Sequence, residues 1–173
     1  MSLPPDSQPS TIPSGSGSSM EAPWAVGGAG HARWIVCEKT GRWATALRQE
    51  PKARGTRLWE TRSLAECWEM LDRSGASFVV AELTSANLDA LLDRLARLPR
   101  DHPLCRVAVV ADRSLARYED LVREAGAGWF VVSPRELGPL AATARRHLRL
   151  APSEPRKLAE RIWASRPWGR AES

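Results

Sequence analysis

Short apolar runs of strand length constrain the fold of this chain more than any other feature. They lie at residues 33–37 (RWIVC), 77–81 (SFVVA), 106–111 (RVAVVA) and 128–133 (GWFVVS), and Glu, Asp or Pro follows each of them directly. A run that is apolar nearly throughout predicts a strand covered on both faces, which is typical of a parallel sheet. A fifth strand is predicted at residues 56–60 (TRLWE), where Leu58 alternates with polar neighbours.

Helical patterns fill the intervals between these strands. Helices are predicted at residues 42–49, from Ser63 onward, and at 88–98, 115–125 and 137–148. Ser63 and Glu66 have the spacing of a capping box, and Pro99 is expected to end the third helix. Five strands alternating with five helices predict an α/β fold. The right-handed crossover rule then favours a flavodoxin-like, doubly wound, five-stranded parallel sheet in the order 2-1-3-4-5.

The domain organisation follows from composition. Residues 1–30 are rich in Ser, Pro and Gly and have too little apolar surface to offset the entropy of ordering, so we expect a disordered tail. Residues 33–150 form the folded domain. Residues 151–173 form a basic, Trp-containing tail with a predicted short helix that begins at Ser153.

Charge and cysteine content exclude several classes of protein. The net charge is +5, but basic residues are interspersed with acidic ones rather than gathered in a stripe, so nucleic acid is an unlikely partner. Three widely spaced cysteines, Cys37, Cys67 and Cys105, indicate free thiols in a reducing compartment. With no transmembrane segment and no secretory signal recognised, we expect a cytoplasmic protein.

Two stretches at strand ends carry a resemblance to a known family. Residues 78–89 (FVVAELTSANLD) resemble the end of strand three in bacterial response-regulator receiver domains, where the phospho-accepting Asp lies. Residues 125–134 (AGAGWFVVSP) are similar to the segment around strand five of the same family. The resemblance spans roughly residues 33–150. It implies a signalling module whose functional residues lie at the carboxyl ends of the strands.

This chain departs from the receiver pattern at nearly every functional position. The resemblance places Glu82 at the phospho-acceptor, Ala111 at the switch hydroxyl, Ser133 at the conserved lysine, and Phe130 at the aromatic switch. The acidic pair that holds Mg²⁺ is replaced by Glu38 and Lys39, or by Cys37 and Glu38 if the register differs by one residue.

We therefore predict a non-catalytic pseudo-receiver, without cofactor or metal, that binds protein partners. For Glu82 two readings stay open: a phosphate mimic that pairs with Lys39, or a tolerated residue on a polar rim. The alternative function is a response regulator that is phosphorylated, or responds to Mg²⁺, through a non-standard acceptor such as Asp112 or Asp89. Ser133 and Pro134 occupy the position of the family's cis peptide, so a cis bond is expected there.

Partner binding is expected at two places. One is the face made by helix 4, strand 5 and helix 5, which receivers commonly use. The other is the C-terminal tail, where an apolar stripe is formed by Leu158, Ile162 and Trp163, with Trp168 nearby. The stripe is interpreted first as a docking peptide for another protein. Packing on its own domain and contact with an anionic membrane remain alternatives.

Overall fold

The structure, a computed structural model, describes residues 31–151, and these contain one five-stranded sheet. Its strands are β1 (Trp34–Cys37), β2 (Leu58–Thr61), β3 (Phe78–Leu83), β4 (Arg106–Ala111) and β5 (Trp129–Val131). All neighbouring strands are parallel, and their order is β2-β1-β3-β4-β5. The predicted fold class and strand order are confirmed.

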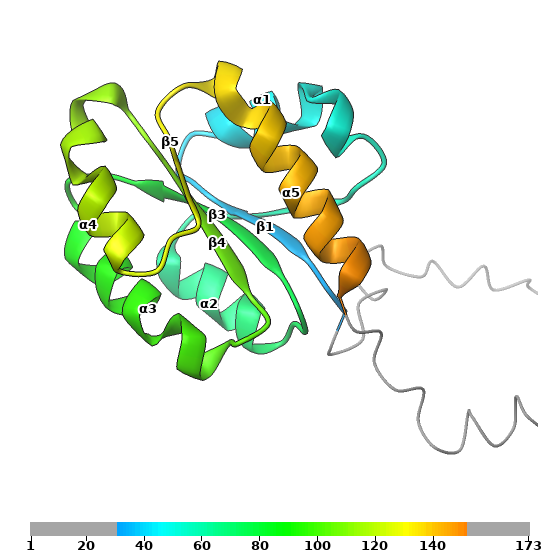
Figure 1. Cartoon of the computed structure of the whole chain (residues 1–173), viewed down its shortest axis with the longest axis horizontal. Helices are drawn as coiled ribbons and strands as arrows, with labels where there is room; N and C mark the ends of the chain where they lie inside the picture. Colours follow the sequence, from blue (N-terminus) through cyan, green and yellow to red (C-terminus); the bar gives the residue numbers. More distant parts are fainter. Residues whose placement is uncertain (1–30, 152–173) are drawn as a thin grey trace, which may run out of the picture.

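Five α-helices cover the two faces of this sheet. They are α1 (Arg42–Gln49), α2 (Leu64–Asp72), α3 (Leu88–Asp101), α4 (Glu119–Glu124) and α5 (Leu137–Leu150). Helices α1 and α5 lie on one face, and α2, α3 and α4 lie on the other (Figure 1). In β3, Phe78 and Val80 therefore pack under α1 and α5, whereas Val79 and Ala81 pack under the other three helices. This double coverage explains why the run is apolar without alternation.

Tryptophans contribute strongly to both cores. Trp34 and Trp68 are buried, and Trp59 and Trp129 pack on the cores while partly exposed. Trp43, which the sequence analysis did not single out, is fully buried on α1. The fold thus uses tryptophan where many domains use Leu or Phe.

Three local predictions were wrong. Helix α3 continues past Pro99 to Asp101, because proline removes only its own N–H, and the His102 N–H still donates to the Leu98 carbonyl at 2.8 Å. The helix expected at 115–125 is divided into a 3₁₀ helix (Arg113–Tyr118) and α4, since its first turn closes with i→i+3 bonds. The bond between Ser133 and Pro134 is trans, as are all peptide bonds among the described residues.

The described chain begins and ends at the same edge of the molecule, beside the amino end of β1 (Figure 1). The predicted disordered tail at 1–30 and the predicted helix from Ser153 lie outside the described residues. No helix in residues 31–151 is long and apolar enough to cross a membrane.

Candidate functional site

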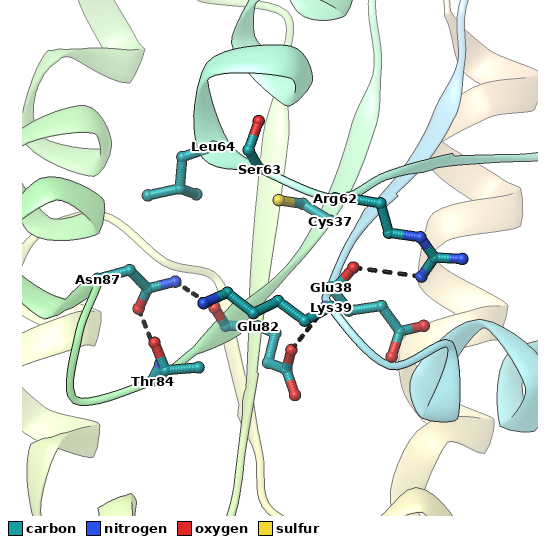
Figure 2. A pocket seen from close by; sticks show the side chains of 9 residues that line it. All are labelled: Cys37, Glu38, Lys39, Arg62, Ser63, Leu64, Glu82, Thr84 and Asn87. Atoms are coloured by element: carbon teal, nitrogen blue, oxygen red, sulfur yellow. Dashed lines mark hydrogen bonds between the residues drawn. The ribbon is translucent and has the colours of Figure 1, made fainter.

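The carboxyl ends of β1 and β3 and the amino end of α2 enclose a small pocket of about 220 Å³ (Figure 2). Its lining consists of Cys37, Glu38, Lys39, Arg62, Ser63, Leu64, Glu82, Thr84 and Asn87. In a doubly wound parallel sheet this edge is where ligands and catalytic groups gather. The pocket brings together Glu38, Lys39 and Glu82, three of the residues that the sequence singled out.

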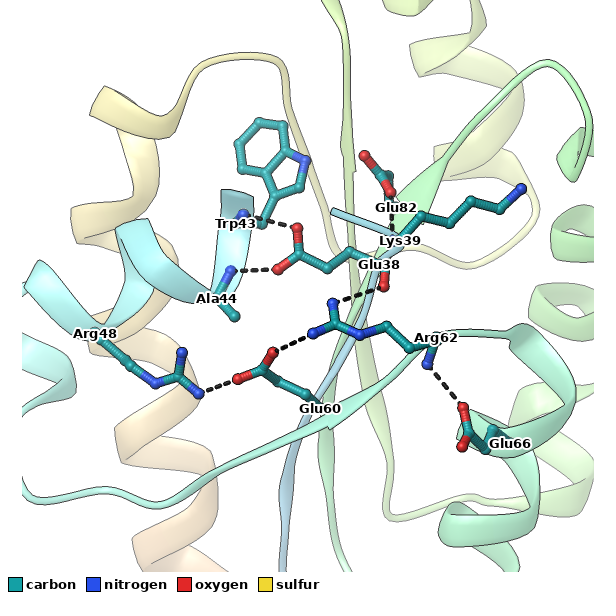
Figure 3. A network of polar contacts seen from close by, with 9 residues as sticks. All are labelled: Glu38, Lys39, Trp43, Ala44, Arg48, Glu60, Arg62, Glu66 and Glu82. Carbon is teal, nitrogen blue, oxygen red and sulfur yellow. Dashed lines mark hydrogen bonds and ion pairs between the residues drawn. The ribbon is translucent and has the colours of Figure 1, made fainter. Parts of the chain in front are cut away.

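Glu38 lines the pocket, but its carboxylate is bonded to helix α1. Its side chain is almost fully buried, and its two carboxylate oxygens accept hydrogen bonds from the Trp43 N–H at 2.8 Å and the Ala44 N–H at 2.5 Å (Figure 3). The N-cap residue of α1 is Gly41, which has no side chain to cap the helix. Glu38, three residues before Gly41, therefore accepts the N–H groups that the side chain of a Ser or Asp N-cap would accept. Its negative charge complements the positive end of the helix dipole.

Lys39 and Glu82 contact each other through the main chain of Lys39. The main-chain N–H of Lys39 donates to Glu82 Oε2 at 3.0 Å. Within residues 31–151 no ion pair links the Lys39 ammonium group to Glu82. The Lys39 side chain instead extends across the pocket toward Asn87 (Figure 2). One oxygen of the Glu82 carboxylate is thus held by the backbone that follows β1.

An Asn-centred turn fixes the loop after β3. The Asn87 side chain accepts from the Thr84 N–H at 2.7 Å and donates to the Glu82 carbonyl at 2.8 Å. Both bonds reach back along the chain, by three and five residues, and so tie the loop to the end of β3. The Thr84 hydroxyl is buried and has no hydrogen-bond partner. Sequence reasoning treated Asn87 only as part of a family-like stretch and missed its structural role.

Arg62, also missed, brings its guanidinium group to the main chain of Glu38. Its guanidinium donates to the Glu38 carbonyl at 3.3 Å and to the Glu60 carboxylate at 3.1 Å, and its main-chain N–H donates to Glu66 at 2.8 Å (Figure 3). Glu60 also pairs with Arg48. The sequence signal for this network was a glutamate and an arginine two residues apart, at 60 and 62, a pattern that solvated surfaces also show.

The pocket does not fit the Mg²⁺ ion that the receiver fold implies. Mg²⁺ requires several unengaged oxygen ligands in near-octahedral geometry. Both Glu38 oxygens are bonded to helix α1, one Glu82 oxygen is bonded to Lys39, and Arg62 brings a positive charge to the same wall. No group of three or more His, Cys, Asp and Glu side chains in residues 31–151 could hold a metal ion.

The remaining predicted switch positions lie apart from this pocket. Ala111 is fully buried at the end of β4, and Phe130 is buried in the core under α2, α3 and α4. The Ser133 hydroxyl accepts from the Arg135 N–H at 3.3 Å and so caps a 3₁₀ helix. None of these three side chains lines the pocket.

The alternative acceptors are also outside it. Asp112 follows β4 and forms an exposed ion pair with Arg42 at 2.6 Å, with two-thirds of its side chain in solvent. Asp89 lies exposed in the first turn of α3. Neither carboxylate lines the pocket at the strand ends.

All three cysteines are free and buried, as predicted. A hydrogen bond with the Cys67 thiol lowers the pKa of Cys37, the one cysteine that lines the pocket, against the opposing effect of its burial. The same bond, together with burial, raises the pKa of Cys67. Burial raises the pKa of Cys105 to about 12.

Comparisons with known proteins agree with this architecture. No family model matches the chain, and no curated protein matches it. A response regulator of Burkholderia pseudomallei, solved with a phosphorylated aspartic acid, a calcium ion and citrate, superposes with a TM-score of 0.53 at 16% identity, covering 78% of this chain and 71% of that one. An orphan response regulator of H. pylori has a TM-score of 0.53 at 21% identity, covering 68% and 97%.

A third solved structure is an atypical orphan response regulator whose description reports a phosphorylation-independent regulatory mechanism. Its TM-score is 0.52 at 21% identity, and the match covers 68% of this chain and 96% of that one. Identities this low establish the fold alone. The chain therefore has the fold of response-regulator receiver domains, as the resemblance implied.

Proposed function

We propose that this chain is a pseudo-receiver: a non-enzymatic, cytoplasmic interaction module that acts without accepting a phosphoryl group. The observation that carries the proposal is the engagement of Glu38. A receiver needs an acidic pair free to hold the metal, and here the acidic residue after β1 has both oxygens bonded to the N-terminus of α1. Releasing it would leave two buried N–H groups without partners.

The acceptor position supports the same proposal. Glu82 carries its carboxylate one methylene farther from the backbone than Asp, and one of its oxygens is held by the Lys39 N–H. In-line phosphoryl transfer depends on close alignment of the nucleophile. A longer and already bonded side chain, beside a pocket whose oxygens are engaged elsewhere, meets that requirement poorly.

Regulation without phosphorylation has a parallel among proteins of this fold. The atypical orphan regulator described above is reported to use a phosphorylation-independent mechanism. The loss of the metal pocket in this chain is compatible with such a mode of action. Signalling would then depend on which partners the surface binds rather than on chemistry at the strand ends.

Two surfaces are proposed for partners. The first is the face formed by α4, β5 and α5, where Leu121 is 45% exposed beside the edge strand of the sheet. The second is the C-terminal tail, through Leu158, Ile162, Trp163 and Trp168. Tryptophan, which the tail carries at 163 and 168, is enriched among the residues that dominate binding energy at protein interfaces.

A second candidate function is phosphorylation at a non-standard acceptor. Asp112 favours it, since its carboxylate is two-thirds exposed at the end of β4 and an arginine lies beside it. Such a site would require that Arg42 release the carboxylate. Asp89 is the other exposed candidate.

Intact-mass spectrometry with a small phosphodonor and Mg²⁺ separates the two candidates. We expect no gain of about 80 Da in the whole chain. A gain that disappears in Asp112→Asn or Asp89→Asn would establish the second candidate and refute the first. Glu82→Gln is the matched control, because a gain lost only in this variant would show that the ordinary acceptor position is active.

Partner binding is tested by a pull-down from native lysate with three whole-chain baits: the unaltered protein, Leu121→Asp, and Trp163→Ala/Trp168→Ala. Loss of a specific partner from one variant assigns the surface that holds it. Retention of no partner by any bait would count against an interaction module.

A further inference from the structure

A second and larger hollow lies at the opposite edge of the sheet. It is an open groove of about 520 Å³ at the amino ends of β4 and β5, beside the last turns of α5. The residues that matter for its chemistry are Leu104, Arg106, Trp129, Arg146, Leu150 and Ala151. Its volume is in the range of sites that enclose several side chains of a ligand or peptide.

The groove exposes an apolar surface that a stable domain usually covers. Leu104 is 53% exposed and Leu150 is 71% exposed. They are two of the three large apolar side chains that stand exposed in residues 31–151. The third, Leu121, lies away on α4. Two such leucines on one groove mark it as a docking surface.

The chain itself supplies the nearest apolar segment. Ala151 lines the groove and is the last described residue, so residues 152–173 continue from the groove wall. Leu158 follows seven positions later and Ile162 four positions after that. Seven residues span at most about 25 Å, so the stripe cannot leave the neighbourhood of the groove. A short tether of this kind gives an effective concentration in the millimolar range.

The tail is basic overall, with five basic and three acidic residues at 152–173, so only its acidic residues complement the basic groove wall. The charged side chains on the groove wall are Arg106 and Arg146, both exposed, and the wall also carries His147. In the tail, Glu154 precedes Leu158 by four positions, so a helix would place it on the same face as Leu158 and Ile162. The apolar stripe could then enter the groove with a carboxylate near its arginines.

We propose that this groove holds the apolar stripe of the chain's own C-terminal tail. Docking is intramolecular and covers Leu104 and Leu150 with Leu158 and Ile162. A partner that binds the tail must first displace it from the groove. Docking of the tail does not depend on the pseudo-receiver function, so a test can refute one of these two proposals and leave the other standing.

Limited trypsin digestion of the whole chain tests the proposal. Cleavage between Arg161 and Ile162, followed by mass spectrometry, reports the fraction of time for which the tail is free. With a tethered concentration near 1 mM and an intrinsic dissociation constant of about 0.1 mM, the tail is free roughly a tenth of the time. Leu104→Glu, which weakens docking about tenfold, should speed this cleavage about fivefold.

Two variants complete the design. Ala90→Glu is the control, because it places the same charge at an exposed position of α3 outside the groove and outside both surfaces proposed for partners, and it should leave the cleavage rate unchanged. Leu158→Ser removes the stripe without altering the folded domain, so it should accelerate cleavage even if Leu104→Glu were to perturb the fold. Circular dichroism checks that each variant melts like the unaltered chain.

The cleavage rates of the variants decide whether the tail occupies the groove. Acceleration by Leu104→Glu and by Leu158→Ser, at rates independent of protein concentration, supports the proposal. Equal rates in all variants would overturn it, because the tail would then be free throughout. Protection that grows between about 1 and 100 µM protein would also overturn it, since a second copy would be the occupant.

Discussion

Removing the Glu38 carboxylate is the sharpest test of the structural reasoning behind the candidate site. In Glu38→Ala, the N–H groups of Trp43 and Ala44 lose their acceptors while staying buried. An unsatisfied buried donor costs about 1–3 kcal/mol, and the lost charge at the helix N-terminus adds about 0.3–1 kcal/mol. With two such donors, we therefore expect the free energy of unfolding to fall by about 2–7 kcal/mol, with a central value of about 4 kcal/mol.

Urea denaturation followed by circular dichroism measures this loss. With a slope of about 2 kcal/mol per molar urea, the midpoint should fall by about 2 M. Glu38→Gln should lower the free energy of unfolding by roughly half as much, because its amide oxygen can still accept one of the two hydrogen bonds. Lys39→Ala is the neighbouring control and should change the free energy of unfolding by less than about 0.5 kcal/mol.

The result that would refute the reasoning is a Glu38→Ala variant as stable as Lys39→Ala. Glu38 would then not be the cap of α1, and its carboxylate would be free for a metal. A stabilising effect of Mg²⁺ on the unaltered chain that vanishes in Glu38→Ala would point the same way.

Three further predictions concern titration and backbone geometry. Desolvation lowers the pKa of His147 in the folded domain. As the pH falls below about 6.5, the unfolded chain therefore takes up a proton before the folded one does, and the domain should lose stability. His147→Gln should flatten this pH dependence of the melting temperature, measured from pH 7.5 to 5. Iodoacetamide should modify Cys37 before Cys105, because a hydrogen bond with Cys67 lowers the pKa of Cys37 whereas burial raises the pKa of Cys105 to about 12. Peptide mapping over time measures the order, and faster modification of Cys105 would contradict the prediction. Gly41 has a φ of +83°, so Gly41→Ala should cost about 1–2 kcal/mol in the same urea assay, and an unchanged midpoint would exclude the left-handed cap.

The sheet could be predicted because its signal is local and repeated. Each buried strand is covered on both faces, so each one appears in the sequence as a run without alternation, and the crossover rule leaves few orders for five such strands. Element ends were less predictable. Pro99 was expected to end α3, but a proline removes one hydrogen bond, and the last turn still closes between His102 and Leu98.

The candidate site was predicted only as a set of positions. The sequence placed Glu38, Lys39 and Glu82 at one edge of the sheet, and the structure brings them into one pocket. It could not say which way Glu38 faces, because that depends on a helix whose own cap is a glycine. Nor could it place Arg62, which reaches the site from the end of β2.

What the sequence determined by itself is the fold class, the strand order and the departure from the receiver pattern, since these depend on residue type, periodicity and order along the chain. What only the tertiary structure decided is how the polar groups are partnered. Hydrogen bonding depends on positions within a few tenths of an ångström between residues far apart in the chain. For that reason a carboxylate that looked like the remnant of a metal site is in the structure the cap of a neighbouring helix.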